Sequence, residues 1–226
     1  MSTRKVALDC LLETAKPKKI VEVGTWLGES CFLFMELGKK QGMRPQILCI
    51  DTWLGSWEHW NKNIPGWGMN ELLIEDGEPQ LFKRFLQSVA ESEFRDQISW
   101  LRCSSQSSGK YLEKYFTDAD LVYVDGDHST ESVLGDLRVL FHCYPKALMA
   151  GDDFAWLSVR LAVAKFALKN NLQIFVAEDS TTWALVETSE VSSKLMIQGW
   201  VRKRIAPIIF EDKFIRIKTQ IKKLLD

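Results

Sequence analysis

Short apolar runs alternate along this chain with stretches of helical periodicity, and this alternation constrains the fold more than any other feature. Runs of the strand type lie at 19–23, 47–50, 98–103 and 121–124. Between them, apolar residues recur every three or four positions, as they do on one face of a helix. Strands that alternate with helices form parallel sheets built of βαβ units. We therefore expect an α/β fold with a doubly wound, mostly parallel sheet.

The same patterns predict the individual elements. Seven strands are expected, at 19–23, 47–50, 98–103, 121–124, 147–150, 172–176 and 183–186. The expected helices span 3–16, 28–40, 79–91, 130–142 and 155–169, and a further helix ends at residue 116. Because only a short polar turn separates the last two strands, they are expected to pair as a C-terminal antiparallel hairpin.

The composition is that of a globular protein with little net charge. The 226 residues suffice for one domain with a sizeable core, and 29 basic residues nearly balance 30 acidic ones. This balance argues against a nucleic-acid binder. Five cysteines without a C-x-x-C spacing, and the absence of a run of about 18 apolar residues, predict a reduced, cytoplasmic protein.

We expect one domain over residues 1–190 and a basic helical extension over 191–226. From Val191 onward nine Lys and Arg residues face three Asp and Glu residues, and 206–225 has helical periodicity. The favoured interpretation is that the apolar face of the expected helix at 206–225 packs on its own domain or on a second subunit of a homo-oligomer. A peripheral membrane contact is the alternative.

The segment 52–78 breaks the regular alternation. It carries four tryptophans among glycines and a proline and has no clear period. Long irregular loops in compact domains often act as lids or binding loops, so we predict a substrate lid. The alternative is that its tryptophans only cover the core.

Polar residues at successive strand ends suggest a binding site for a nucleotide-like cofactor. Glu22 and Gly24 end the first strand, Asp51 ends the second, and Ser105 and Gln106 follow the third. In an open parallel sheet, ligands bind at the carboxyl ends of the strands, where an acid such as Asp51 can hold ribose hydroxyls. The candidate cofactor contacts are Glu22, Gly24, Thr25, Trp26, Gly28, Ser30, Asp51, Thr52, Ser105, Gln106 and Asp125.

A second group of acids follows the next two strands. Asp125 follows the strand at 121–124, and Asp152 and Asp153 follow the one at 147–150. Carboxylates at neighbouring strand ends can meet at one cation, and hard oxygen ligands suit Mg²⁺. His128 is the candidate general base, because its unperturbed pKa lies near neutral pH. Alternatively, His128 points to water while Asp127 or Ser129 caps the following helix.

These motifs resemble a known family. Glu22-x-Gly24-x-x-x-Gly28 followed by a strand-ending Asp51 is similar to the S-adenosylmethionine site of class I methyltransferases, over about residues 15–187. The Asp-Gly-x-His sequence and the later acidic pair resemble metal-dependent O-methyltransferases, in particular macrolide-sugar O-methyltransferases and the cephalosporin-hydroxylase-like group. Asp152 stands where those relatives often carry Glu.

The resemblance implies the roles of the acidic group and the reaction. Asp125, Asp152 and Asp153 would be metal ligands, and His128 the general base that favours the sugar-modifying branch. The implied activity is Mg²⁺-dependent methyl transfer from S-adenosylmethionine to a hydroxyl of a small molecule, such as a sugar, glycoside or phenol. Two alternatives are a haloacid-dehalogenase-type phosphatase, with Asp125 and Asp127 as its D-x-D motif, and a methyltransferase-like scaffold without turnover.

Overall fold

One twisted sheet of eight strands forms the centre of the molecule, in the order β10-β8-β9-β7-β6-β1-β2-β5. The computed structural model describes residues 3–61, 68–178, 181–187, 190–205, 207–209 and 211–212. The strands are β1 (Lys19–Val23), β2 (Gln46–Asp51), β5 (Ile98–Arg102), β6 (Leu121–Val124), β7 (Leu148–Gly151), β8 (Gln173–Val176), β9 (Trp183–Val186) and β10 (Val201–Lys203). The pairs among β5, β2, β1, β6 and β7 are parallel, whereas β9 runs antiparallel to both β7 and β8.

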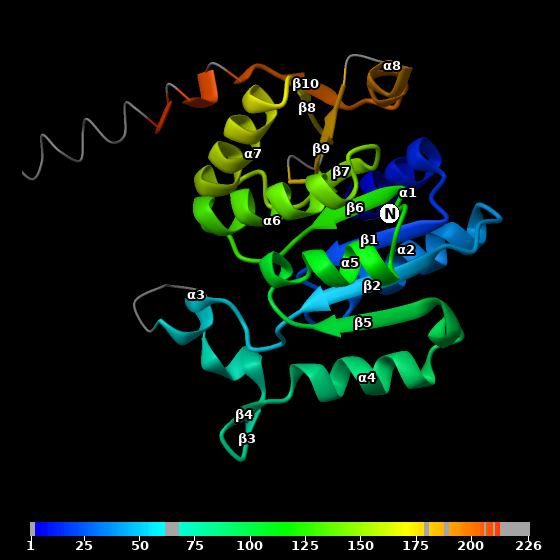
Figure 1. Cartoon of the computed structure of the whole chain (residues 1–226), viewed down its shortest axis with the longest axis vertical. Coiled ribbons are helices and arrows are strands. Elements are labelled where there is room, and N and C mark those ends of the chain that lie inside the picture. Colours follow the sequence, from blue (N-terminus) through cyan, green and yellow to red (C-terminus); the bar gives the residue numbers. More distant parts are fainter. Residues whose placement is uncertain are drawn as a thin grey trace, which may run out of the picture.

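Helices cover both faces of this sheet (Figure 1). The helices are α1 (Thr3–Ala15), α2 (Glu29–Lys40), α4 (Leu81–Glu91), α5 (Gly109–Tyr115), α6 (Thr130–Cys143), α7 (Leu157–Lys169) and α8 (Glu190–Ile197). Two short 3₁₀ turns, η2 (Arg95–Gln97) and η3 (Ser105–Ser107), flank β5.

The core has two apolar layers, one on each side of the sheet. Ile20 belongs to the layer of α1, α2, α4 and α8, and its neighbour Val21 to the layer of α5, α6 and α7. Successive residues of a strand point to opposite faces, so strands buried on both sides become continuous apolar runs. The runs in the sequence predict this arrangement for that reason.

The predicted fold class is confirmed, and so is the C-terminal antiparallel hairpin of β8 and β9. The seven predicted strands are present, and the sheet has an eighth, β10, in the segment for which only a helix was expected. β10 pairs antiparallel with β8 at the edge of the sheet. The main sheet therefore extends past the predicted domain boundary at residue 190.

Most of the predicted tail helix at 206–225 lies outside the described residues, so its packing or membrane contact stays a prediction. In the described part, Arg160 of α7 contacts Glu211 at 3.3 Å. None of the described helices has the length and apolarity needed to cross a membrane.

The segment 52–78 contains short elements rather than a structureless loop. They are α3 (Trp57–Trp60), η1 (Met69–Leu72), β3 (Ile74–Glu75) and β4 (Glu78–Pro79). Trp53 is fully buried in the core, whereas Trp57 and Trp60 are 50% and 48% exposed. Trp67 lies outside the described residues. One tryptophan thus covers the core and two remain accessible, and the lid assignment stays a prediction.

Candidate active site

A cavity of about 550 Å³ opens at the carboxyl ends of β1, β2, β5 and β6. This is the edge at which chain connections leave the neighbouring strands β1 and β6 toward opposite faces, where open α/β sheets bind ligands. The predicted site residues that line the cavity are Gly24, Thr25, Trp26, Ser30, Asp51, Thr52, Ser105, Gln106, Asp125, His128 and Asp153. Glu22, Gly28 and Asp152 are not among its lining residues.

The turn after β1 requires glycine at its first position. Gly24 has a φ of +82°, and a Cβ there would lie 2.0 Å from the carbonyl oxygen of Asp125. This close approach brings the turn after β1 against the turn after β6. Gly24 therefore joins the two halves of the predicted site.

Glu22 supports this turn from within the core. Its carboxylate accepts hydrogen bonds from the hydroxyl of Ser30 at 2.6 Å and from that of Thr25 at 2.9 Å. Complete burial raises the pKa of Glu22, and the two hydroxyls oppose that rise. Glu22 thus fixes two residues that line the cavity, and it does not line the cavity itself.

Asp51 stands at the end of β2 with its carboxylate held by the backbone. The N–H groups of Trp26 and Trp53 donate to its two oxygens at 2.8 Å and 2.7 Å. Burial raises the pKa of Asp51, and these N–H groups oppose the rise. Each carboxylate oxygen can accept a further hydrogen bond, so Asp51 can still hold hydroxyls of a ligand in the cavity.

The residues after β5 meet an acid that the sequence did not single out. The Ser105 hydroxyl donates to the carboxylate of Asp136, which lies inside α6 and also lines the cavity. Burial raises the pKa of Asp136 to about 6. A single acid within an amphipathic helix gives no local signal, because most such acids face solvent.

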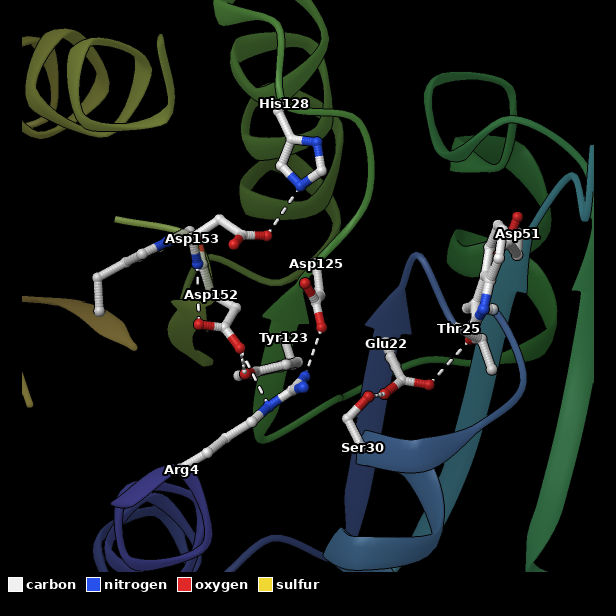
Figure 2. Close-up of polar contacts among 12 residues, drawn as sticks. Arg4, Glu22, Thr25, Ser30, Asp51, Tyr123, Asp125, His128, Asp152 and Asp153 are labelled. Carbon is white, nitrogen blue, oxygen red and sulfur yellow. Dashed lines mark hydrogen bonds and ion pairs between the residues drawn. The ribbon is translucent and has the colours of Figure 1, made fainter. Parts of the chain in front are cut away.

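Arg4 lies between the two carboxylates that the sequence predicts as metal ligands, as Figure 2 shows. Its Nη2 is 2.7 Å from Asp125 Oδ2, and its Nε is 3.0 Å from Asp152 Oδ2. The Tyr123 hydroxyl donates to the same Asp152 oxygen at 3.3 Å. Burial raises the pKa of Asp125, Asp152 raises it further, and Arg4 opposes the rise.

His128 is held by three side chains from two other segments, α3 and the turn between β7 and α7. Its Nε2 lies 2.9 Å from Asp153 Oδ2, its Nδ1 lies 3.5 Å from Glu58 Oε1, and its ring stacks on Trp156. Burial alone would lower the pKa of His128, but the hydrogen bond and charge of Asp153 and the charge of Glu58 raise it.

The solvent-facing alternative for His128 is therefore wrong, since its side chain is only 11% exposed. Ser129 caps α6, because its hydroxyl accepts the N–H of Ser132. Asp127 accepts the N–H of Ser129 at 2.6 Å and shapes the turn.

The three predicted metal ligands do not converge. Asp125 and Asp152 are joined by Arg4, and Asp153 is turned to His128. Within the described ranges, the set of three metal-ligating side chains whose ligand atoms lie within 4.8 Å of one another is Glu22, Cys31 and Cys49, in the core. As arranged, the side chains at the sheet edge do not fit a divalent cation.

Comparison with known proteins assigns the family. Residues 21–154, more than half of the chain, match a family described as a methyltransferase domain. The chain belongs to this methyltransferase family. The predicted resemblance to class I methyltransferases is confirmed at this level. The phosphatase alternative drops out, since the motif containing Asp125 and Asp127 lies inside the matched domain.

Solved structures share the fold at low sequence identity. The TDP-rhamnose 3′-O-methyltransferase CalS11 of calicheamicin biosynthesis matches with a TM-score of 0.58 at 17% identity, over 83% of this chain and 80% of its own. The O-methyltransferase NovP matches at 0.57 and 16%, over 83% and 80% of the two chains. TomG, an O-methyltransferase from Streptomyces achromogenes, matches at 0.54 and 14%, over 83% and 81%. A search of curated protein sequences found no match.

Proposed function

We propose that this protein transfers the methyl group of S-adenosylmethionine to a hydroxyl of a small molecule, in particular a sugar or a natural-product glycoside. One observation carries the proposal. His128, the candidate base, lines the same cavity as Gly24 and Asp51, the residues expected to hold the cofactor. The membership of the methyltransferase family supports the reaction type.

The cavity has the size and the polar groups that this cofactor needs. A volume of about 550 Å³ is within the usual range of small-molecule sites. Asp51 can accept hydrogen bonds from the ribose hydroxyls of the cofactor. Polar groups for its adenine ring come from Ser105, Gln106 and Asp136. Asp125 can accept a hydrogen bond from the amino group of its methionine part. These assignments rest on the chemistry of the lining groups.

The cofactor, when bound, supplies an electrophilic methyl group on a sulfonium. A neutral alcohol is a weak nucleophile, so the chain must orient the hydroxyl and remove its proton. The imidazole of His128 is the group that takes the proton, while Asp153, 2.9 Å from Nε2, stabilises the charged ring. Glu58, buried near Nδ1, favours the ring orientation in which Nε2 faces Asp153. Trp156 holds the plane of the ring by stacking.

A sugar-like acceptor is supported by the aromatic surface near His128. Trp156 stacks on His128 and is exposed, and Trp57 and Trp60 are exposed on α3, the helix whose Glu58 faces His128. Indole rings combine a flat apolar face with a hydrogen-bond donor, which suits sugar faces. CalS11, one of the structural neighbours, acts on a nucleotide-linked rhamnose.

Cytoplasmic location is part of the proposal and is supported by five cysteines that are all free thiols. Magnesium dependence is left out of it, because Arg4 stands between two of the predicted ligands and Asp153 faces His128.

The test is methyl transfer from labelled S-adenosylmethionine to a panel of nucleotide-linked sugars, macrolide glycosides and catechols. We expect turnover with a sugar acceptor. His128→Ala should reduce kcat by about 10²- to 10⁴-fold, the usual contribution of a general base. His142→Ala is the matched control, because the His142 side chain is 80% exposed and does not line the cavity.

Calorimetry with S-adenosylhomocysteine separates the outcomes. Unchanged affinity in His128→Ala together with lost turnover supports the assignment of the base. Tight binding by the wild-type protein without turnover on any hydroxyl acceptor would favour the inactive scaffold. No binding at all would refute the cofactor assignment.

A further inference from the structure

The acidic edge of the sheet already contains a cation that belongs to the chain. The guanidinium of Arg4 contacts Asp125 Oδ2 at 2.7 Å and Asp152 Oδ2 at 3.0 Å. Arg4 comes from the first turn of α1, far from both acids in the sequence. A guanidinium remains charged at every physiological pH, so this positive charge is permanent.

Both oxygens of the Asp152 carboxylate have partners in this arrangement. Asp152 Oδ1 accepts the backbone N–H of Asp153 at 2.9 Å, and its Oδ2 accepts from Tyr123 and faces Arg4. The indole N–H of Trp183 donates to the Asp152 carbonyl at 2.8 Å and fixes the backbone there. Buried carboxylates are costly unless paired and hydrogen-bonded, and Arg4 supplies the pairing.

Arg4 is itself held in place by the packing of its helix. Leu8 and Leu11, one and two turns further along α1, are fully buried in the core layer that also contains residues of α2. The arginine also lines the cavity, beside Gly24 and Ser30. It is therefore part of the wall of the site and not a solvent-facing side chain that happens to meet an acid.

The third predicted metal ligand is engaged elsewhere. Asp153 Oδ2 lies 2.9 Å from His128 Nε2. Mg²⁺ needs oxygen ligands in a near-octahedral arrangement at about 2.0–2.1 Å, so it requires the carboxylates to close around one point. A guanidinium wedged between Asp125 and Asp152 prevents that closure.

We propose that Arg4 is the resident cation of this edge and takes the place of a divalent metal between Asp125 and Asp152. Arg4 is a positioning residue, because it holds the carboxylates of both Asp125 and Asp152. Of these two acids, Asp125 lies beside Gly24 in the cavity wall. The part of Arg4 in methyl transfer rests on the proposed function. Whether Arg4 or a metal ion lies between the two carboxylates does not depend on that function, so the test measures cation binding and not turnover.

The experiment titrates Mn²⁺, an oxygen-binding ion whose free form has a strong electron paramagnetic resonance signal. The proteins are the wild type, Arg4→Gln, Arg4→Lys and the control Arg138→Gln, each with and without S-adenosylhomocysteine. Arg138 is exposed on α6. Circular dichroism first establishes that each variant is folded.

We expect the wild type, Arg4→Lys and Arg138→Gln to leave the free-ion signal unchanged. Arg4→Gln should bind Mn²⁺ at least about tenfold more tightly, because the Asp125 and Asp152 carboxylates lose their cation. Adding Asp152→Asn to Arg4→Gln should abolish the gain, which places the ion between these acids.

Two results would overturn the proposal. One is tight one-to-one binding of Mn²⁺ by the wild-type protein, with or without S-adenosylhomocysteine, that Asp152→Asn removes. The other is a folded Arg4→Gln protein with no gain in affinity. The wild-type measurement decides the question even if Arg4→Gln does not fold.

Discussion

At the level of single residues, His128 combines the properties expected of a general base with an unusual degree of support. Carboxylates lie on both ring nitrogens, Asp153 at Nε2 and Glu58 at Nδ1, and Trp156 stacks on the ring. Neighbouring negative charge stabilises imidazolium, so the raised pKa of His128 follows from Asp153 and Glu58. The ring is thus tuned toward holding a proton.

This tuning predicts a specific pH dependence. A base acts only when deprotonated, so activity should rise with pH through the pKa of His128. Asp153→Asn removes the largest raising influence, and the rising limb of the kcat/KM profile should move to lower pH. Rate measurements between pH 5 and pH 9 check this. Glu131→Gln, an exposed acid in the first turn of α6, is the control and should leave the limb in place.

Asp136 predicts a pH effect on stability. Its pKa is about 6 in the folded protein against 3.8 ordinarily, so the folded state binds more protons between these values. This contribution is fully present below the unfolded pKa and is lost as pH rises through about 6. Asp136→Asn cannot ionise, so its unfolding free energy relative to wild type should improve by about 3 kcal/mol from pH 3.5 to pH 7.5. Urea unfolding at both pH values measures it, and an equal difference at the two would contradict the buried-acid account.

At the level of elements, the turn between β1 and α2 and the turn after β6 depend on each other. Gly24 combines a positive φ with a backbone contact to Asp125, whereas Gly77 has the same φ of +82° and nothing within 4 Å of a Cβ. Substitution of Gly77 therefore tests backbone strain alone, whereas substitution of Gly24 adds a steric clash with the Asp125 backbone. Crowding at Gly24 would disturb both halves of the cavity.

Gly77→Ala should lower the free energy of unfolding by about 1 kcal/mol, the strain of a residue in the left-handed conformation. Gly24→Ala should lower the free energy of unfolding by about 2 kcal/mol more than Gly77→Ala, because its Cβ would overlap the backbone carbonyl of Asp125. Thermal unfolding of both variants provides the comparison. Equal losses would mean that the contact between the two turns is not rigid.

At the level of the whole molecule, the sheet order brings residues far apart in the chain to one edge. β1 lies between β2 and β6, so the ends of the first, second and fourth predicted strands surround one cavity. A ligand bound there contacts several elements of the fold at once. Binding should therefore stabilise the whole domain.

We expect S-adenosylhomocysteine at roughly 100 times its Kd to add about 2.7 kcal/mol to the free energy of unfolding. Asp51→Asn should retain most of the fold but lose most of this gain, since the hydroxyl-accepting carboxylate is gone. Thermal shift against ligand concentration measures both. Asp96→Asn, whose side chain is 88% exposed, should behave as the wild type, and a full gain in Asp51→Asn would refute the ribose assignment.

The sequence alone determined the alternation of strands and helices and the position of the strand-end acids. These features are local, because periodicity and backbone conformation depend on residues a few positions apart. The tertiary structure decided what the acids do. Arg4 meets Asp125 across 121 positions, and Glu58 meets His128 from the segment after β2. No local pattern encodes such contacts, since they arise only when α1 and α3 pack beside the sheet. The same acidic edge that predicts a metal in the sequence therefore holds an arginine in the fold.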